Sequence, residues 1–437
     1  MESWKKVVKA VTLGAAILAL GACGNPKAKS GGSEKAEDGT SKISFWTFEK
    51  LHVEYFEDAA KTWNEKNPDK KVEIDATVIP FDQLYQKLTL ALQSGNGAPD
   101  MADVELNQAA TQLKGDEPAY LPLNNELEPY QTDIVQSRLD NYKKGDKYYG
   151  LDYHVGAVVT YYNTELLEQA GVDYKTIKTW DDYTEAGKKV KEKTGKWMTE
   201  VETNSSFVFD SLVAQQKADY IKDGKADLEN PAAVKALTML QNWVKKDKIA
   251  RDAVGGNLDN EEFFPEMNKG NVASITMPAW EMSRFVNYMP DLKGKIAIAP
   301  MPVFEEGNNR SAAGGGTGTM VTKDAKNPET VKEFLCFAKG DKEQAIKQWT
   351  LLGFDPINTD TWSMPEMKED NKYTEYLGKD IFDTLLEIKD EIQGVTKTDA
   401  INPKLNEELL TKVIPNTMTD DENPEKALKD ADAAINK

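Results

Sequence analysis

Reactive side chains are few in this 437-residue chain, which contains two cysteines and two histidines. Cys336 lies in the apolar run 331–338, so we predict a core residue rather than a reactive thiol. His52 and His154 have no cysteine cluster beside them, and no zinc-ligand spacing or disulfide framework is present. We therefore expect no metal ion, no cofactor and no catalytic cysteine or histidine.

Cys23 is the exception, because its surroundings are those of a thiol that becomes modified. It follows a basic start and a short apolar run over residues 11–20, a pattern typical of a secretory signal peptide. The segment Leu20-Gly-Ala-Cys23 looks like a lipobox, in which the thiol receives a diacylglycerol and the cysteine becomes the mature N-terminus. The alternative is an ordinary secreted protein with a chance cysteine. We predict a signal peptide over residues 1–22 and a lipid anchor on Cys23, which needs no transmembrane helix.

Residues 23–41 are predicted to be a lipid-anchored tether. Positions 24–41 contain no large apolar residue, so they cannot bury a face and should be flexible. The net charge is −19, and removal of residues 1–22, with three lysines and one glutamate, takes it to −21. Such acidity argues against nucleic acid as a partner, and against a protein that lies on an anionic membrane surface. A body of this length normally divides into two domains.

The body begins with alternating strand and helix patterns. Apolar or alternating segments at 43–48, 72–78 and 100–105 predict strands, and helical faces lie between them. Asp82 is expected to cap the second of these helices. Strand, helix, strand, helix, strand predicts an α/β wound sheet, with binding sites at the carboxyl ends of its strands.

The alternation starts again after residue 147. Further strands are predicted at 147–151, 155–162, 272–277, 295–299 and 319–322. Helices are predicted at 164–170, from a Thr179 cap onward, at 231–246, at 329–338 and through most of the last hundred residues. The coarse picture is two wound α/β units joined by more than one crossing.

A series of motifs, in this order behind a lipobox, resembles the extracellular solute-binding proteins of carbohydrate ABC transporters, in the maltose-binding-like group. They lie at residues 43–48, 88–103, 149–154, 159–163, 179–183, 273–280 and 299–302, and in the glycine run before Val321. Within that group, residues 45–48, 90–95, 137–140 and 151–156 resemble the arabino-oligosaccharide-binding branch.

Two departures from the pattern affect the expected site. Gly315-Gly-Thr317 stands where many relatives have Gly-Gly-Trp or Gly-Ala-Trp, so one usual aromatic platform is expected to be missing. Gly353-Phe-Asp-Pro-Ile357 replaces the more common Gly-Tyr-Leu-Pro pattern.

The resemblance implies a type II periplasmic-binding-protein-like fold with two lobes. The first lobe would hold residues 42–153 plus 313–352, and the second 154–303 plus 356–437. Crossings would lie near 153–156, 303–313 and 352–357. A ligand bound between the lobes stabilises their closure, because only the closed form touches it from both sides.

The resemblance also implies partners and a location. The expected ligand is an oligosaccharide that contains arabinose, and the expected protein partners are the permease subunits of an ABC transporter. We expect a monomer, held by its lipid on the extracellular face of the membrane in a cell without an outer membrane.

Sugar hydroxyl groups need planar hydrogen-bonding partners, and the C–H faces of a sugar pack on aromatic rings. Aromatic and acidic residues at strand ends, and glycines that allow close backbone approach, are therefore the candidates. The predicted substrate-binding residues are Trp46, Thr47, Glu49, Asp103, Glu105, Asp152, His154, Phe207, Phe209, Trp280, Gly315, Gly316, Phe354 and Asp355.

Structural roles remain open for several of these residues. Trp46 and the two phenylalanines are alternatively core residues, and His154 a structural residue of the hinge. Glu49 is alternatively a charge at a helix start and Asp103 an N-cap. Trp280 follows Pro278 at a position where relatives place an aromatic ring over the ligand. The tryptophans interpreted as structural are Trp180, Trp243, Trp349 and Trp362.

Other functions are compatible with parts of this pattern. An extracellular glycoside hydrolase needs two carboxylates at a fixed separation across one bond, and no pair in the sequence stands in an identifiable catalytic setting. Binding proteins for another sugar class or for a peptide are further alternatives. The histidine and cysteine counts disfavour a metal carrier.

Overall fold

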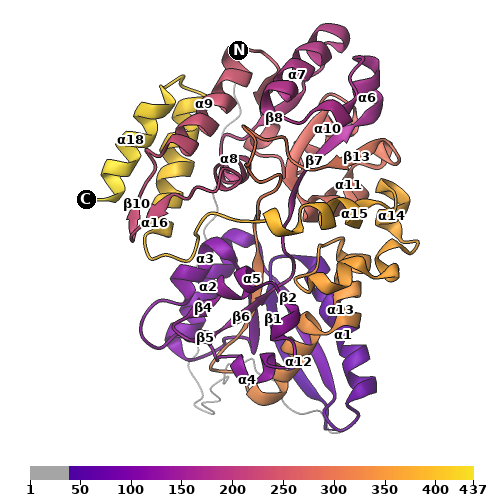
Figure 1. Cartoon of the computed structure of the whole chain (residues 1–437). Helices are drawn as coiled ribbons and strands as arrows, with labels where there is room; N and C mark the ends of the chain where they lie inside the picture. Colours follow the sequence, from indigo (N-terminus) through magenta and orange to yellow (C-terminus); the bar gives the residue numbers. More distant parts are fainter. Residues whose placement is uncertain (1–38) are drawn as a thin grey trace, which may run out of the picture. The chain divides into compact units, whose positions relative to one another are not determined.

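The computed structural model describes residues 39–437 (Figure 1). The predicted signal peptide, Cys23 and the tether up to residue 38 lie outside the described residues. Across residues 39–437, no helix has the length and apolar character that a membrane crossing requires.

A five-stranded sheet organises the first group of elements, in the order β2-β1-β3-β14-β6. Its strands are β1 (Ser41–Thr47), β2 (Val72–Val78), β3 (Met101–Glu105), β6 (Gly150–Asp152) and β14 (Thr317–Val321). β1 pairs in parallel with β2 and β3, whereas β14 runs antiparallel between β3 and β6. The chain thus returns to this sheet after a long excursion, because β14 lies between β3 and β6. The lobe boundaries at 313 and 352 stay a prediction.

Helices pack on this sheet, and together they form what we call the first lobe. They are α1 (Lys50–Lys66), α2 (Phe81–Ser94), α3 (Leu106–Gln112), α4 (Asn124–Leu127), α5 (Gln136–Asp140), α12 (Pro328–Gly340) and α13 (Lys342–Lys347). The small hairpin of β4 (Lys143–Lys144) and β5 (Lys147–Tyr148) belongs here too. The predicted Asp82 cap is wrong: α2 starts after Pro80, and Asp82 lies within its first turn without a capping bond.

The second lobe contains two smaller sheets. In the first, with the order β12-β7-β13, the central strand β7 (Val158–Asn163) pairs antiparallel with β12 (Ser274–Pro278) and with β13 (Ile296–Ala299). β8 (Thr199–Val201) and β11 (Ala250–Asp252) form a parallel pair, and β9 (Ile221–Lys222) and β10 (Lys225–Ala226) a hairpin.

Helices surround these sheets and form most of the C-terminal region, as predicted. They are α6 (Thr164–Gln169), α7 (Trp180–Thr194), α8 (Phe207–Ala214), α9 (Pro231–Lys245), α10 (Phe264–Asn268), α11 (Met282–Tyr288), α14 (Lys372–Leu377), α15 (Ile381–Glu387), α16 (Asn402–Glu408), α17 (Ile414–Met418) and α18 (Pro424–Ile435).

Local signals account for several of these elements. Thr179 caps α7 as predicted: its hydroxyl accepts from the Asp182 amide at 3.1 Å, and the Asp182 carboxylate accepts from the Thr179 amide at 2.9 Å. The four tryptophans predicted to be structural are buried. Cys336 is fully buried, as predicted for a core residue, and burial raises the pKa of its thiol.

Three chain segments cross between the lobes and are hydrogen-bonded to one another. The Val155 amide donates to the Asp355 carbonyl at 2.8 Å, and the Gly314 amide donates to the Gly156 carbonyl at 2.8 Å. The Val158 amide donates to the Ala312 carbonyl, also at 2.8 Å. The three segments therefore lie side by side, while the crossings near residues 153–156, 303–313 and 352–357 stay a prediction. The described residues lie within one compact unit.

Candidate functional site

A cavity of about 570 Å³ is lined by residues of both lobes, and we call it the cleft. Its lining combines aromatic rings, side-chain amides, charged groups and backbone. The lining residues are Phe48, Glu49, His52, Phe81, Glu105, Asn107, Gln108, His154, Asn204, Ser205, Ser206, Phe207, Asp210, Asn257, Asp259, Trp280, Arg284, Gly315, Gly316, Thr317, Phe354, Asn406 and Leu410.

The second lobe contributes a pair of aromatic rings. Strand β12 ends at Pro278, and the turn that follows carries Trp280, while Phe207 is the first residue of α8. The two ring centroids are 5.8 Å apart, with an angle of 66° between the planes. The indole N–H of Trp280 donates to the Gly314 carbonyl at 3.3 Å. The two rings form a braced apolar surface of the kind that packs on the C–H face of a sugar.

The first lobe contributes a second aromatic pair. Phe48 directly follows β1 and Phe81 begins α2, and their ring centroids are 5.1 Å apart. Phe81 is 42% exposed, an unusual exposure for a phenylalanine. Aromatic side chains therefore reach the cleft from both lobes.

An arginine links the two lobes at the cleft. The Arg284 guanidinium lies 2.8 Å from the Asp259 carboxylate, 3.8 Å from the Glu49 carboxylate and 5.6 Å from the Trp280 ring centre. Glu49 also caps α1 by accepting from the Leu51 amide at 3.1 Å. Glu49 therefore combines the two positions considered for it: it caps a helix and it lines the cleft.

Asp103 lies behind the cleft wall and is fully buried. Its carboxylate accepts from the hydroxyls of Thr47 at 2.6 Å, Thr319 at 2.7 Å and Tyr153 at 3.1 Å, and lies 2.8 Å from His52 Nδ1. Burial raises the pKa of Asp103, but His52 and the donated hydrogen bonds have a larger, opposite effect. The pKa of Asp103 is therefore lowered overall. The anion fixes the ring of His52, which lines the cleft and stacks on Tyr153 at 3.8 Å.

Two other strand-end acids differ in position. Glu105 caps α3 through the Asn107 amide at 2.9 Å and lines the cleft, and burial raises its pKa to about 7. Asp152 is buried behind Gly316, with Asn141 Nδ2 at 3.2 Å and Arg138 Nη1 at 3.6 Å. Burial raises the pKa of Asp152 as well.

The crossing segments place His154 and Phe354 together. Their ring centroids are 5.1 Å apart, and both side chains line the cleft. His154 Nδ1 has no hydrogen-bond partner among the described residues, and burial holds the pKa of the ring well below its ordinary value. Asp355 does not line the cleft; it accepts from the Ala157 amide at 2.7 Å, and burial raises its pKa to about 7.

The structure brings eight of the fourteen predicted site residues to the cleft: Glu49, Glu105, His154, Phe207, Trp280, Gly315, Gly316 and Phe354. The other six, Trp46, Thr47, Asp103, Asp152, Phe209 and Asp355, do not line it. Trp46 packs beside Leu84 and Tyr85, and Phe209 faces Tyr220 at 5.5 Å. Phe209 is two residues after Phe207 on a helix, and so it points into the core of the second lobe.

Several lining residues are not among the predicted ones. Phe48 directly follows the predicted Thr47, and Arg284 is four residues after Trp280, one helical turn further along. These two positions were within reach of local reasoning. Asn107 is two residues after the predicted Glu105 and bonds to its carboxylate. Other lining residues that were not predicted are His52, Phe81, Gln108, Asn204, Asp210, Asn257, Asp259 and Asn406.

Comparison with known proteins gives a matching family and similar relatives. Residues 50–345 match the model of a family described as bacterial extracellular solute-binding protein. The chain is 45% identical to the arabinooligosaccharide-binding protein of Bacillus subtilis (strain 168), over 87% of each chain. It is 42% identical to the arabinooligosaccharide-binding protein of Halalkalibacterium halodurans, over 91% of this chain and 89% of that one.

A solved structure gives the same architecture. The chain superposes with a TM-score of 0.74 on the ABC transporter associated binding protein from B. animalis subsp. lactis Bl-04, in complex with β-1,6-galactobiose. The match covers 90% of this chain and 96% of that one, at 22% identity. It confirms the predicted fold class.

Proposed function

This chain belongs to the family of bacterial extracellular solute-binding proteins, and from that premise we propose that it captures an arabinose-containing oligosaccharide in the cleft. It then delivers the sugar to the permease of an ABC transporter. Members of this family bind solutes rather than hydrolyse them, so the glycoside hydrolase alternative finds no support.

One observation carries the assignment of the cleft. The Trp280 and Phe207 rings lie on the second lobe and the Phe48 and Phe81 rings on the first, with amides and carboxylates between them. Rings can pack on C–H faces, while amides and carboxylates can pair with hydroxyl groups. A ligand held there touches both lobes, so its binding energy favours the form in which the lobes meet around it.

Calorimetry with a panel of sugars tests the substrate class. Purified protein is titrated with arabino-, malto- and xylo-oligosaccharides of equal length. We expect the arabinose series to bind at least about tenfold more tightly than the other two, a difference of about 1.4 kcal/mol. Binding of only a non-arabinose series, or of none, would remove the proposed substrate.

We also propose that lipid on Cys23 holds this protein as a monomer near its permease, with residues 24–41 as the tether. A short tether raises the effective concentration of the sugar-loaded protein at the transporter. Cys23→Ser is expected to shift the protein from the membrane fraction to the culture medium. Retention of the variant in the membrane fraction would refute the anchor, and light scattering of the purified protein at twice the chain mass would refute the monomer.

A further inference from the structure

Lysines are concentrated in one part of the second lobe. Residues 188–196, 245–248 and 269–271 contain nine lysines and two acidic residues, whereas the whole chain has a net charge of −19. The first two segments cover the C-terminal ends of α7 and α9 (Figure 1), and the third directly follows α10. We call these three segments the lysine edge.

Strand pairing brings the three segments together, since they lead into β8, β11 and β12. The Met198 amide donates to the Ile249 carbonyl at 2.9 Å, and the Trp197 amide donates to the Asn271 carbonyl at 3.1 Å. Lys196 Nζ lies 2.6 Å from Asn271 Oδ1. The lysine edge is therefore one contiguous region at the amino ends of these strands.

The carboxyl ends of the same strands lead to the cleft. Phe207 follows β8, Asp259 follows β11 and Trp280 follows β12, and all three line the cleft. The lysine edge thus lies on the side of the second lobe away from the cleft, and none of its residues lines the cleft. A role of the lysine edge is therefore separable from ligand capture.

Most of the positive charge at the lysine edge is free. Asp247 is already paired with Lys188 at 3.5 Å, and Glu192 with Lys193 at 3.0 Å. Five other lysines of the edge form no ion pair among residues 39–437: Lys189, Lys245, Lys246, Lys248 and Lys269.

Helix ends account for only part of this cluster. The partial negative charge of a helix C-terminus favours Lys191 and Lys193 in the last turn of α7, and Lys245 in that of α9. Lys189 precedes that last turn, and Lys248 follows the end of α9 with a φ of +58°, which a lysine rarely adopts. Stabilisation of helix ends therefore does not explain the whole lysine edge.

The composition of the lysine edge indicates the kind of partner. Protein interfaces favour arginine and aromatic side chains and are depleted in lysine. Separate ammonium groups on flexible stems suit a partner whose negative charges repeat along a chain, because each contact releases counterions.

The position of the lysine edge favours a polymer over the membrane. β1 begins at Ser41, and its carboxyl end leads to Phe48 in the cleft, so the chain enters the first lobe on the side away from the cleft. The tether proposed above therefore keeps the membrane nearest to the first lobe and not to the lysine edge.

We propose that the lysine edge binds a linear, phosphate-bearing polymer outside the membrane. Its free ammonium groups contact successive phosphate groups, while the acidic remainder of the chain repels the polymer from other surfaces. This contact is independent of which sugar the cleft binds.

Binding of the purified protein to immobilised long-chain polyphosphate, followed by biolayer interferometry, tests the proposal. We expect binding at about 50 mM salt and a loss of about a hundredfold in affinity at about 200 mM, the dependence of about five phosphate contacts with a flexible polymer. No binding at the lower salt concentration overturns the proposal.

A fourfold variant locates the binding. Asn replaces Lys248 because it tolerates a positive φ, and Gln replaces the others. The affinity for polyphosphate should fall by at least about tenfold. The four changes are Lys189→Gln, Lys246→Gln, Lys248→Asn and Lys269→Gln.

A control variant removes the same charge elsewhere. It replaces with Gln four exposed first-lobe lysines that form no ion pair among residues 39–437, and it should bind polyphosphate as the wild type does. An equal loss in both variants would mean that net charge alone governs binding, and would overturn the lysine edge. The control positions are Lys61, Lys71, Lys87 and Lys114.

Glu192→Gln tests the same surface in the opposite direction. The change frees Lys193, so the affinity for polyphosphate should rise by about twofold or more. This variant keeps the test decisive if thermal unfolding shows that the fourfold variant does not fold. An unchanged or lower affinity of Glu192→Gln contradicts the proposal.

Vesicles distinguish a polymer from a lipid surface. At about 50 mM salt, co-sedimentation with phosphatidylglycerol vesicles should be at least about tenfold weaker than binding to polyphosphate, because a flat surface also faces the acidic remainder of the protein. Binding to these vesicles but not to polyphosphate would assign the lysine edge to the membrane and overturn the polymer.

Discussion

The rings of Trp280 and Phe207 meet at an angle of 66°, with centroids 5.8 Å apart, although the two residues are 73 positions apart in the sequence. The pair is anchored to a crossing segment, because Trp280 donates to the Gly314 carbonyl. The position of the aromatic surface therefore depends on how the chain passes between the lobes.

Replacement of Trp280 by Ala tests the aromatic surface. The loss of a large apolar face in contact with a sugar is expected to weaken binding by about 1–3 kcal/mol. Isothermal titration calorimetry with an arabino-oligosaccharide measures the change. Tyr288→Ala is the control, because Tyr288 is a 50% exposed aromatic residue that does not line the cleft. Equal affinities of wild type and Trp280→Ala would exclude Trp280 from the site.

Gly156→Ala tests the packing of the crossing segments. Gly156 has a φ of +70°, and an added Cβ would overlap the carbonyl oxygen of Gly314. Gly171 has a φ of +67° with no atom within 4 Å of an added Cβ, so Gly171→Ala reports the backbone cost alone. We expect about 1 kcal/mol for Gly171→Ala and at least about 2 kcal/mol more for Gly156→Ala in urea unfolding. Similar losses of unfolding free energy in the two variants would show that the crossing segments move apart to accept the added Cβ at little cost.

Asp355→Asn tests the buried carboxyl at the same crossing. Burial raises the pKa of Asp355 from 3.8 to about 7, so the folded state holds its proton more tightly than the unfolded state. The resulting stabilisation is complete below about pH 4 and is lost as the pH rises through 7. Asn keeps an oxygen for the Ala157 amide but does not titrate.

Urea unfolding of both proteins between pH 4 and 8 measures this effect. The free energy of unfolding of the wild type should fall relative to that of Asp355→Asn by a few kcal/mol over this range. Parallel pH profiles would mean that folding does not raise the pKa of Asp355.

Lys339→Met tests a buried amine beneath the cleft. Lys339 is fully buried, its Nζ lies over the Tyr153 ring, and it has no hydrogen-bond partner among the described residues. Burial holds the pKa of Lys339 well below its ordinary value, against the opposing effect of Asp103 and Asp152. Met keeps the apolar shape without the amine, so we expect the variant to be more stable by about 1–3 kcal/mol at pH 7.

The pH dependence of that difference identifies its cause. Because the pKa is lowered on folding, the wild type gains stability as the pH rises towards 10.5, and the difference should narrow by pH 10. Unfolding in urea at pH 7 and pH 10 measures it. A variant less stable than wild type at pH 7 would indicate a charged lysine that stabilises the two aspartates.

Local sequence patterns predicted most of the secondary structure and part of the cleft. The Thr179 cap, the strand that contains Trp46 and the strand that precedes Trp280 depend on neighbouring residues, so a linear pattern contains them. Asp103 was placed at the end of its strand, but its partner Thr319 comes from a strand 216 residues away. No local pattern shows that Thr319 holds the Asp103 carboxylate in the interior, behind the residues that line the cleft.

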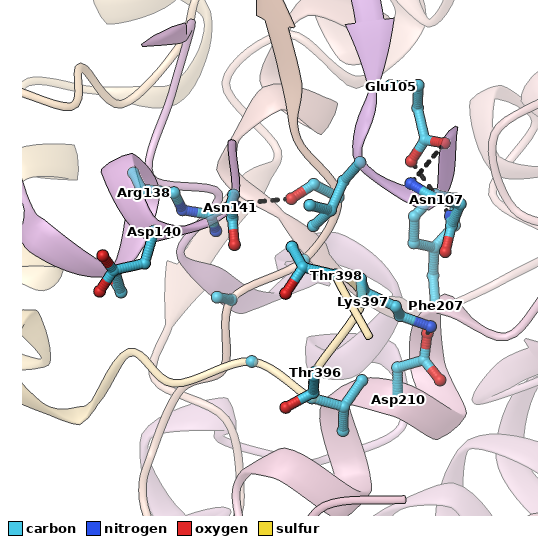
Figure 2. Close-up of a pocket in the computed structure, with 17 residues that line it drawn as sticks. Glu105, Asn107, Arg138, Asp140, Asn141, Phe207, Asp210, Thr396, Lys397 and Thr398 are labelled. Atoms are coloured by element: carbon cyan, nitrogen blue, oxygen red, sulfur yellow. Dashed lines mark hydrogen bonds and ion pairs between the residues drawn. The ribbon is translucent and has the colours of Figure 1, made fainter. Parts of the chain in front are cut away.

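The direction of side chains limited the remaining predictions. Phe207 and Phe209 are equivalent candidates in the sequence, whereas helix α8 directs Phe207 to the cleft and Phe209 to the core. The cavity lined by Arg138, Phe207 and Lys397 (Figure 2) is not predictable from local patterns, because it requires residues 394–398 to meet α5 and α8. Contacts of this kind between distant segments are decided by the packing of the whole chain.

A crystal structure of this protein with a bound arabino-oligosaccharide tests the central claim most directly. The account predicts a sugar ring packed on Trp280 and Phe207, with other atoms of the same ligand in contact with first-lobe residues such as Phe48 and Glu105. A ligand found outside the cleft, or in contact with one lobe alone, would contradict it.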